Sequence, residues 1–149
     1  MRDLRRAGMA ALVLIAVGTP WTAYGAPSIV KVELSDPSSD GHLHTMQIRL
    51  SSASVHAGVV DFDVHNNSPT LVHEMVIVRL EKPGQRLPYD PKSDEVVEDQ
   101  TRKLGEVSDL DPLSHGTLRL NLQPGTYALL CNRPGHFYAG MQAMLTVVP

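Results

Sequence analysis

The most informative part of the chain is residues 125–148, GTYALLCNRPGHFYAGMQAMLTVV, in which two short apolar runs flank a loop. The runs at 126–130 and 143–148 have the length and the period-2 pattern of half-buried strands. Between them Cys131, His136 and Met141 follow the spacing C-x4-H-x4-M. A loop that joins two adjacent strands can bring a thiolate, an imidazole and a thioether to one point.

Short strands are predicted along most of the rest of the chain. Alternating or continuous apolar runs occur at residues 28–34, 45–50, 59–64, 73–80 and 116–122. They are separated by turn signals such as QPG at 123–125, and the chain has 11 glycines and 11 prolines. This pattern predicts an all-β fold, a single-domain β-sandwich with a Greek-key course.

One segment departs from the strand pattern. Residues 89–110 are polar and acidic, and residues 93–103 are predicted to form a short capped helix within an insertion between two strands. Acidic runs such as 90–111 are usually solvated surfaces. A docking patch for a basic partner protein is the alternative function of this acidic insertion.

The first 25 residues have the composition of a secretory signal peptide. A basic start is followed by an apolar run over residues 7–17 and by small residues in A-x-G order at 23–25. We therefore expect cleavage after Gly25, a mature domain over 26–149, and a periplasmic or otherwise exported protein. An uncleaved membrane anchor is the alternative, and Arg5-Arg6 is a weak match to a twin-arginine signal. No other segment is long and apolar enough to cross a membrane.

The net charge argues against nucleic acid as a partner. Removing residues 1–25 takes away three arginines and one aspartate, so the formal net charge of −3 becomes −5. Nucleic-acid binding needs basic patches that displace counterions. A negative domain leaves basic protein partners open, and we expect it to be a monomer.

The chain has one cysteine, Cys131, which cannot form an internal disulfide. In an oxidising compartment such a residue is an intermolecular bridge, a buried inert thiol or a metal ligand. The neighbouring His136 and Met141 favour a metal ligand. His73, at the start of a predicted strand and after the turn at 66–69, is the natural fourth donor.

A His2Cys set with a weak axial methionine is the blue-copper arrangement. Thiolate and thioether suit Cu(I), and imidazole suits both oxidation states. We therefore predict one copper ion bound by His73, Cys131, His136 and Met141. Zinc could use the cysteine and two histidines, but it gains little from a thioether. Met144 is an alternative axial ligand, although its place in a predicted strand favours packing.

The residues from Tyr127 to His136, with Gly140-Met141, resemble the copper loop of the cupredoxin family, which includes plastocyanin, azurin and pseudoazurin. The segment from Asn66 to His73 and the turn from Pro124 to Tyr127 resemble the same family. The resemblance covers roughly Val59 to Pro149. It implies a Greek-key β-sandwich, one copper ion that cycles between Cu(I) and Cu(II), and one-electron transfer between redox partners.

In this family the second histidine has an edge near solvent inside an apolar collar. The resemblance therefore implies that redox partners dock near His136, Phe137 and Tyr138. It also implies that the chain is not an enzyme, because copper enzymes built from such domains need more domains and further histidine clusters. A hydrolase that uses Cys131 and a histidine would leave Met141 unexplained.

Glu74 is a departure from the family pattern. Classical members often have an asparagine after the first histidine, and it ties the two ligand loops together. A carboxylate at that position can accept a backbone N–H from the Cys131 loop in the same way. Our hypothesis is that its negative charge lowers the reduction potential of the copper, because an anion stabilises Cu(II) more than Cu(I).

The remaining histidines leave one alternative function open. His42, His44 and Met46 resemble a labile copper-acquisition site, which would suit a copper chaperone or resistance protein. A polar loop before a strand is the simpler interpretation of these residues. The other histidines are predicted to lie on the surface or at strand ends: His56, His65 and His115.

Overall fold

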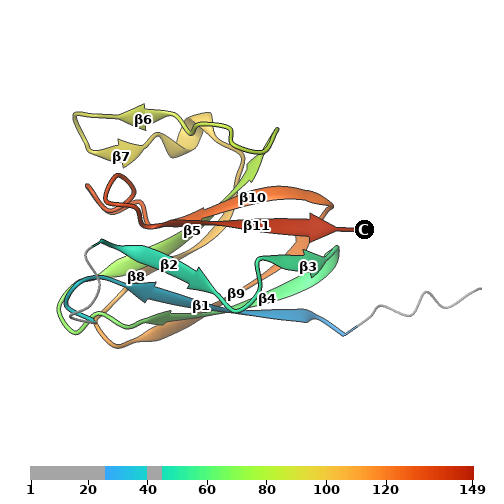
Figure 1. Ribbon diagram of the computed structural model, residues 1–149, viewed down its shortest axis with the longest axis horizontal. Coiled ribbons are helices and arrows are strands. Elements are labelled where there is room, and N and C mark those ends of the chain that lie inside the picture. Colours follow the sequence, from blue (N-terminus) through green and yellow to red (C-terminus); the bar gives the residue numbers. More distant parts are fainter. Residues whose placement is uncertain (1–25, 40–44) are drawn as a thin grey trace, which may run out of the picture.

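The computed structural model describes residues 26–39 and 45–149, which form two β-sheets packed face to face (Figure 1). Sheet 1 has the strand order β2-β1-β4-β9, and sheet 2 has the order β3-β11-β10-β5-β8. The strands of sheet 1 are β1 Ser28–Ser35, β2 Gln47–Leu50, β4 Gly58–Asn66 and β9 His115–Leu122. Those of sheet 2 are β3 Ser54–His56, β5 His73–Leu80, β8 Lys103–Leu110, β10 Gly125–Leu130 and β11 Gln142–Val148.

The Greek-key β-sandwich predicted from the sequence is confirmed. The chain crosses between the sheets after β2, β3, β4, β8 and β9, and only β10 and β11 form a simple antiparallel hairpin within sheet 2. Both sheets are mixed, because β1 is parallel to β4 and β3 is parallel to β11. No helix among the described residues is long and apolar enough to span a membrane.

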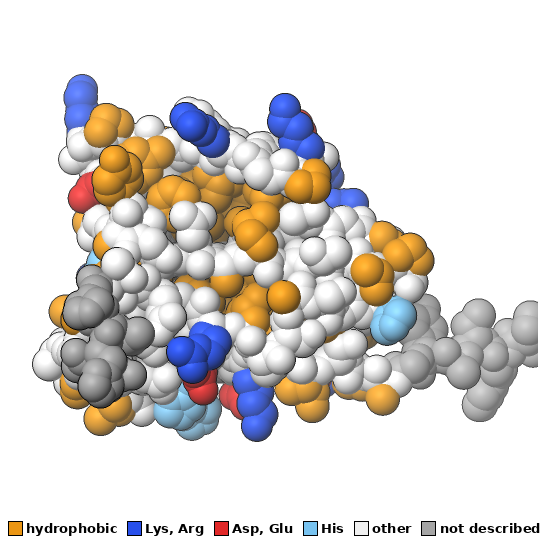
Figure 2. All heavy atoms as spheres, in the orientation of Figure 1, with side chains coloured by type: hydrophobic (Ala, Val, Ile, Leu, Met, Phe, Trp, Pro, Cys, Tyr) orange, Lys and Arg blue, Asp and Glu red, His pale blue; other side chains and the backbone are white. Residues whose placement is uncertain are grey.

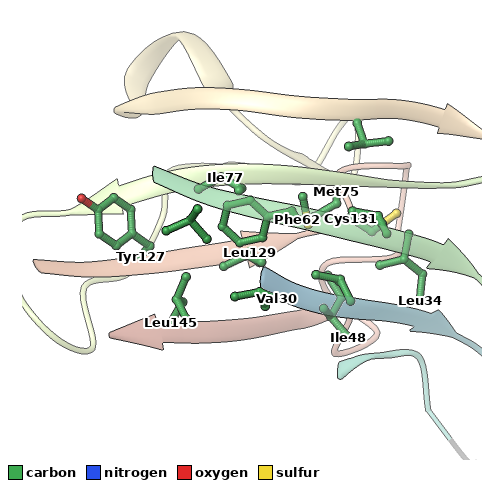
Figure 3. Close-up of a cluster of buried hydrophobic side chains, with 14 of the residues drawn as sticks. Val30, Leu34, Ile48, Phe62, Met75, Ile77, Tyr127, Leu129, Cys131 and Leu145 are labelled. Atoms are coloured by element: carbon green, nitrogen blue, oxygen red, sulfur yellow. The ribbon is translucent and has the colours of Figure 1, made fainter. Parts of the chain in front are cut away.

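Apolar side chains at every second position of the strands fill the space between the sheets. In β1 the inward residues Val30, Val32 and Leu34 are fully buried, whereas the residues between them, Lys31 and Glu33, are exposed. Phe62 of β4, in the same sheet, and Leu129 of β10, in the opposite sheet, belong to the same buried cluster, as Figure 3 shows. Burial of this apolar surface is the main favourable contribution to folding.

The same alternation directs the cysteine into the molecule. Tyr127 and Leu129 of β10 point into the core, so Cys131, two residues further on, points the same way. Figure 3 shows Cys131 at one end of the core, beside Met75 of β5. The end of the sandwich that carries Cys131 therefore adjoins packed apolar side chains.

The insertion differs from the prediction for residues 93–103. Its only helical part is a single 3-10 turn, Glu98–Gln100, and it contains a small antiparallel pair, β6 Tyr89–Asp90 and β7 Glu95–Val96. Residues 103–110 form β8, which pairs with β5 at the edge of sheet 2. The sequence did not indicate β8, because only Val107 and Leu110 of this edge strand are buried.

The segment 87–100, which we call the arm, covers part of the outer face of sheet 2. Leu87, Tyr89 and Val96 of the arm pack on the outward side chains of β5 and β10, which include Val76 and Leu130. Figure 2 shows apolar side chains gathered below the arm, over β10 and β11. A hollow of about 530 Å³ lies there and is lined by Leu80, Leu87, Tyr89, Ala128, Phe137, Tyr138 and Met144 among others.

We predict that Phe62→Ala lowers the free energy of unfolding by about 3–5 kcal/mol, because it leaves a cavity between the two sheets. Ile29→Ala is the control: Ile29 lies on β1 but is 64% exposed. This change should cost about 1 kcal/mol or less, the range of strand propensities. Urea unfolding followed by circular dichroism measures both losses. Equal losses would contradict the core described here.

Candidate metal centre

Three predicted ligands converge at one end of the sandwich. The Nδ1 atoms of His73 and His136 are 3.2 Å apart, and the Sγ of Cys131 lies 3.9 Å from the first and 3.3 Å from the second. His73 and Cys131 are completely buried, and His136 is half-buried. Among the described residues they form a group whose donor atoms all lie within 4.8 Å of one another.

The strand pairing explains why residues distant in sequence meet here. β5 and β10 are antiparallel neighbours, and Val76 of β5 pairs with Leu130 of β10. The start of β5, where His73 lies, is therefore beside the end of β10, where Cys131 lies. The backbone N–H of Glu74 points at the Sγ of Cys131 over 3.4 Å. This contact stabilises negative charge on the sulfur.

The loop between β10 and β11 is held by its own backbone. The N–H of Cys131 donates to the carbonyl of Met141 over 3.1 Å, and the N–H of Met141 donates to the carbonyl of His136 over 3.0 Å. Gly135 and Gly140 have φ of 81° and 98°, a region that residues with a Cβ rarely adopt. Glycine at these two positions allows the tight course that turns His136 back toward Cys131.

The structure favours Met141 over Met144 as the fourth ligand. Met141 is fully buried in the same core cluster as Cys131, and its backbone is bonded to two of the other predicted ligands. Met144 is 42% exposed on β11 and lines the hollow beside Tyr138. The sequence alternative that makes Met144 axial therefore has no support from the geometry.

Glu74 joins the two ligand segments as the sequence suggested. Its Oε1 accepts the backbone N–H of Asn132 over 3.0 Å, which ties the start of β5 to the loop after Cys131. Burial, and then repulsion from Glu98, raise the pKa of Glu74 above its usual value. The side-chain contacts of Asn132, which the sequence did not indicate, extend this tie to the arm. Its amide bonds both the N–H and the C=O of Val96.

The donor atoms are uncharged at neutral pH. Burial lowers the pKa of His73 and of His136, so both rings are neutral and each keeps one lone pair. Burial raises the pKa of the Cys131 thiol to about 11. A metal that binds here must therefore release the thiol proton, as metal sites with thiolate ligands do.

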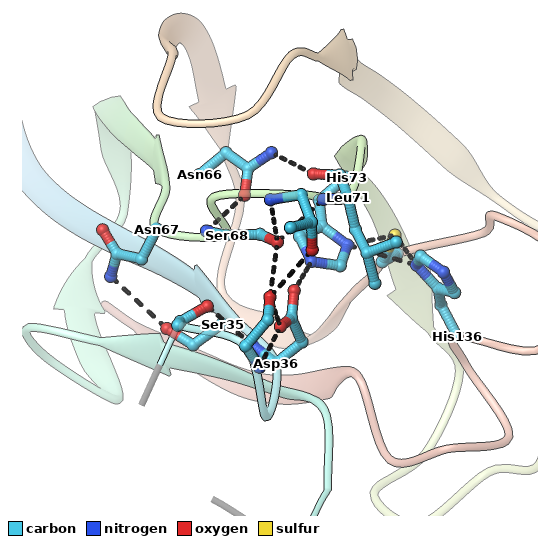
Figure 4. Close-up of polar contacts among 12 residues, drawn as sticks. Ser35, Asp36, Asn66, Asn67, Ser68, Leu71, His73 and His136 are labelled. Carbon is cyan, nitrogen blue, oxygen red and sulfur yellow. Dashed lines mark hydrogen bonds and ion pairs between the residues drawn. The ribbon is translucent and has the colours of Figure 1, made fainter. Parts of the chain in front are cut away.

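Asp36, which directly follows β1, is a buried partner of His73 that the sequence did not reveal. Its Oδ2 lies 2.9 Å from the Nε2 of His73, and the two side chains are 1% and 0% exposed (Figure 4). In the sequence Asp36 followed by proline indicates only the end of a strand. No local pattern could have shown a contact between residues 37 positions apart on different sheets.

The site fits a single metal ion. Bonds of about 2.0–2.3 Å to one ion place neighbouring nitrogen and sulfur ligands roughly 3.3–3.8 Å apart. The three separations are 3.2, 3.3 and 3.9 Å, so one lies at the edge of this range and the other two lie within about 0.1 Å of it. A buried thiol, two neutral imidazoles and a nearby thioether form a soft donor set, which matches copper better than magnesium or calcium.

The two packed mixed sheets, with a Cys–His–Met loop at one end, define a fold of the cupredoxin class. Comparison with solved structures gives the same result. Reduced auracyanin from Roseiflexus castenholzii superposes with a TM-score of 0.58 at 21% identity, and the match covers 83% of this chain and 98% of that one. Auracyanin B gives 0.55 at 25% identity, with 83% and 91% covered.

Rusticyanin from Thiobacillus ferrooxidans, a copper protein, superposes with a TM-score of 0.58 at 18% identity, and the match covers 80% of this chain and 76% of that one. A scan of family models and a search of curated proteins each found no match. The likeness to these solved structures, at 25% identity or less, shows the fold of this chain. This chain therefore has the cupredoxin fold.

The other residues predicted from the sequence have different outcomes. His56, His65 and His115 are exposed, as predicted. His42 and His44 lie outside the described residues, so the histidine cluster near Met46 stays a prediction. The leader and the cleavage after Gly25 also lie outside the described residues.

Proposed function

We propose that this chain is an exported type 1 copper protein that carries single electrons between redox partners. One copper ion would be held by His73, Cys131 and His136, with Met141 as the weak axial ligand. The observation that carries this proposal is the approach of the first three donor atoms to within 3.9 Å of one another inside the cupredoxin fold.

Copper bound there would supply a one-electron couple. The chain would supply ligands whose geometry changes little when the oxidation state of the copper changes. His73 begins a central strand, and Cys131 ends its neighbour. The loop that carries His136 is tied to Cys131 through the backbone of Met141, and the N–H of Asn132 ties it to Glu74 of β5. Ligands held in this way keep one geometry in both oxidation states, which favours rapid electron transfer because little rearrangement is needed.

His136 provides the route to the surface. Of the predicted ligands, it alone is partly exposed, and the others are fully buried. Phe137 is half-buried beside it, and Tyr138 is 80% exposed. An exposed apolar patch next to a functional site favours protein docking. We therefore place the docking surface for redox partners at these three residues.

The acidic surface beside the site favours basic partners. A hollow of about 420 Å³ lies between the arm and the Cys131 loop and is lined by Glu74, Glu95, Glu98, Asp99 and Asp109 among others. Part of this negative charge is neutralised by ion pairs with basic residues of the same chain. Arg133 pairs with Asp109 over 2.8 Å, and Lys103 pairs with Glu98 and Glu106.

We predict that the copper-loaded mature protein shows a strong blue thiolate-to-copper absorption band and the EPR spectrum of a type 1 centre. Cys131→Ser should lose the blue band, because the band requires the thiolate. The protein should also keep its copper when challenged with an apo acceptor. A colourless wild type would contradict the proposal, and ready release of copper would instead favour the copper-handling alternative.

We predict that Met141→Leu raises the reduction potential by about 59 mV or more, equivalent to a tenfold change in the relative affinity for the two oxidation states. The reason is that the axial ligand tunes the potential of such sites. The matched control is Met144→Leu, which removes the same sulfur from an exposed position. It should leave the potential unchanged by cyclic voltammetry. The reverse result would make Met144 the axial ligand.

We predict that Glu74→Asn raises the reduction potential, because it removes an anion beside the copper and preserves a carbonyl that can accept the N–H of Asn132. The shift should reach about 59 mV, or tenfold in relative affinity. Glu33→Gln, on the exposed face of β1, controls for the change in net charge. An equal or lower potential in Glu74→Asn would refute the role of this carboxylate.

A further inference from the structure

The buried carboxylate of Asp36 links the two sheets at the metal centre. It follows β1 of sheet 1, whereas His73 begins β5 of sheet 2. The 2.9 Å contact between Oδ2 and Nε2 is closed to solvent on both sides, with exposures of 1% and 0%. A buried charge in such a place is strongly unfavourable unless hydrogen bonds compensate it.

Hydrogen bonds compensate the charge of Asp36. Its Oδ1 accepts the backbone N–H of Ser38 over 2.6 Å and the hydroxyl of the same residue over 2.5 Å. The Nε2 of His73 lies 2.9 Å from the Oδ2 of Asp36, so hydrogen-bonding partners face both carboxylate oxygens. These partners favour the ionised form of the carboxylate, and Figure 4 shows Ser68 beside it.

The serines belong to a wider buried network, and no buried side-chain nitrogen or oxygen of the described residues lacks a hydrogen-bond partner. The Oγ of Ser68 accepts the backbone N–H of Leu71 over 2.9 Å, and the amide oxygen of Asn66 accepts that of Ser68 over 2.9 Å. The segment between β4 and β5, which leads to His73, is thus built around the carboxylate. A satisfied network of this kind holds its members rigidly.

The contact dictates which nitrogen of His73 faces the metal. A carboxylate can only accept, so the Nε2 of His73 must carry the ring proton. Its Nδ1 then keeps a free lone pair, and this is the atom 3.2 Å from His136 and 3.9 Å from the sulfur of Cys131. Partners of this type fix the tautomer and the ring orientation of metal-binding histidines and raise their basicity.

We propose that Asp36 is a positioning residue that holds His73 in the metal-binding tautomer and, as a buried anion behind the ring, stabilises Cu(II) relative to Cu(I). This inference rests on the proposed function, because it concerns the same copper ion. It adds a second anion to the one at Glu74. Glu74 acts on the Cys131 loop through the N–H of Asn132, whereas Asp36 acts on the metal through the imidazole of His73.

Two variants separate the charge from the positioning. Asp36→Asn keeps the shape and a carbonyl oxygen that can accept the Nε2 proton, but it removes the charge. We expect it to stay blue while its Cu(II)/Cu(I) affinity ratio falls about tenfold, a rise of 59 mV in potential. Asp36→Ala removes the acceptor as well, and we expect its Cu(II) affinity to fall about 10–100-fold. Asp63→Asn, at an exposed position of β4, is the matched control for net charge and should change neither quantity.

A measurement on the copper-free wild type needs neither copper nor a variant that folds. Long-range proton–nitrogen NMR correlations report which ring nitrogen of His73 carries the proton. We expect the proton on Nε2 in the wild type. A proton on Nδ1 in the wild type overturns the proposal. A blue wild type with an equal potential in Asp36→Asn also overturns it, whereas a wild type that takes up no copper overturns the proposed function instead.

Discussion

Three uncharged donor atoms meet in the dry end of this β-sandwich, and the surrounding structure keeps them there. Neutral imidazoles and a protonated thiol can be buried at a moderate cost, whereas charged ones could not. His73 and Cys131 are held by the ends of two paired strands, and His136 is held by a loop bonded back to Cys131 and Met141. A soft metal ion is the natural partner of such a set, because the lone pairs of these buried donors are shielded from water and can bind the metal instead.

Two carboxylates approach this neutral cluster from different sides. Glu74 binds the N–H of Asn132 next to the cysteine, and Asp36 binds the outer nitrogen of His73. Each of them also joins segments that are far apart in sequence, so the groups that hold the ligands in place are the same groups that set the electrostatic field around them. In the proposed copper site, the stability of the site and the tuning of its metal would therefore be coupled.

The insertion that separates β5 from β8 shapes the surroundings of the site. Its arm packs on the outer face of sheet 2, and the amide of Asn132 bonds Val96 of that arm. The N–H of Gly135 in the ligand loop also donates to the carbonyl of Asp94. The arm thereby supports the loop that carries His136, and its acidic residues form one wall of the hollow beside it. A segment that looked like a solvated surface in the sequence is thus part of the frame of the metal centre.

The sequence by itself determined the class of fold and three of the converging donors. Period-2 alternation predicted seven strands, and C-x4-H-x4-M on a hairpin loop pointed to Cys131 and His136, because short-range spacing constrains where neighbouring side chains can reach. It also suggested His73 from its place at a strand start. Only the tertiary structure revealed Asp36, the amide contacts of Asn132 and the edge strand β8. These depend on pairing between segments dozens of residues apart, and a polar residue that is satisfied by a distant partner has the same local pattern as one that faces water.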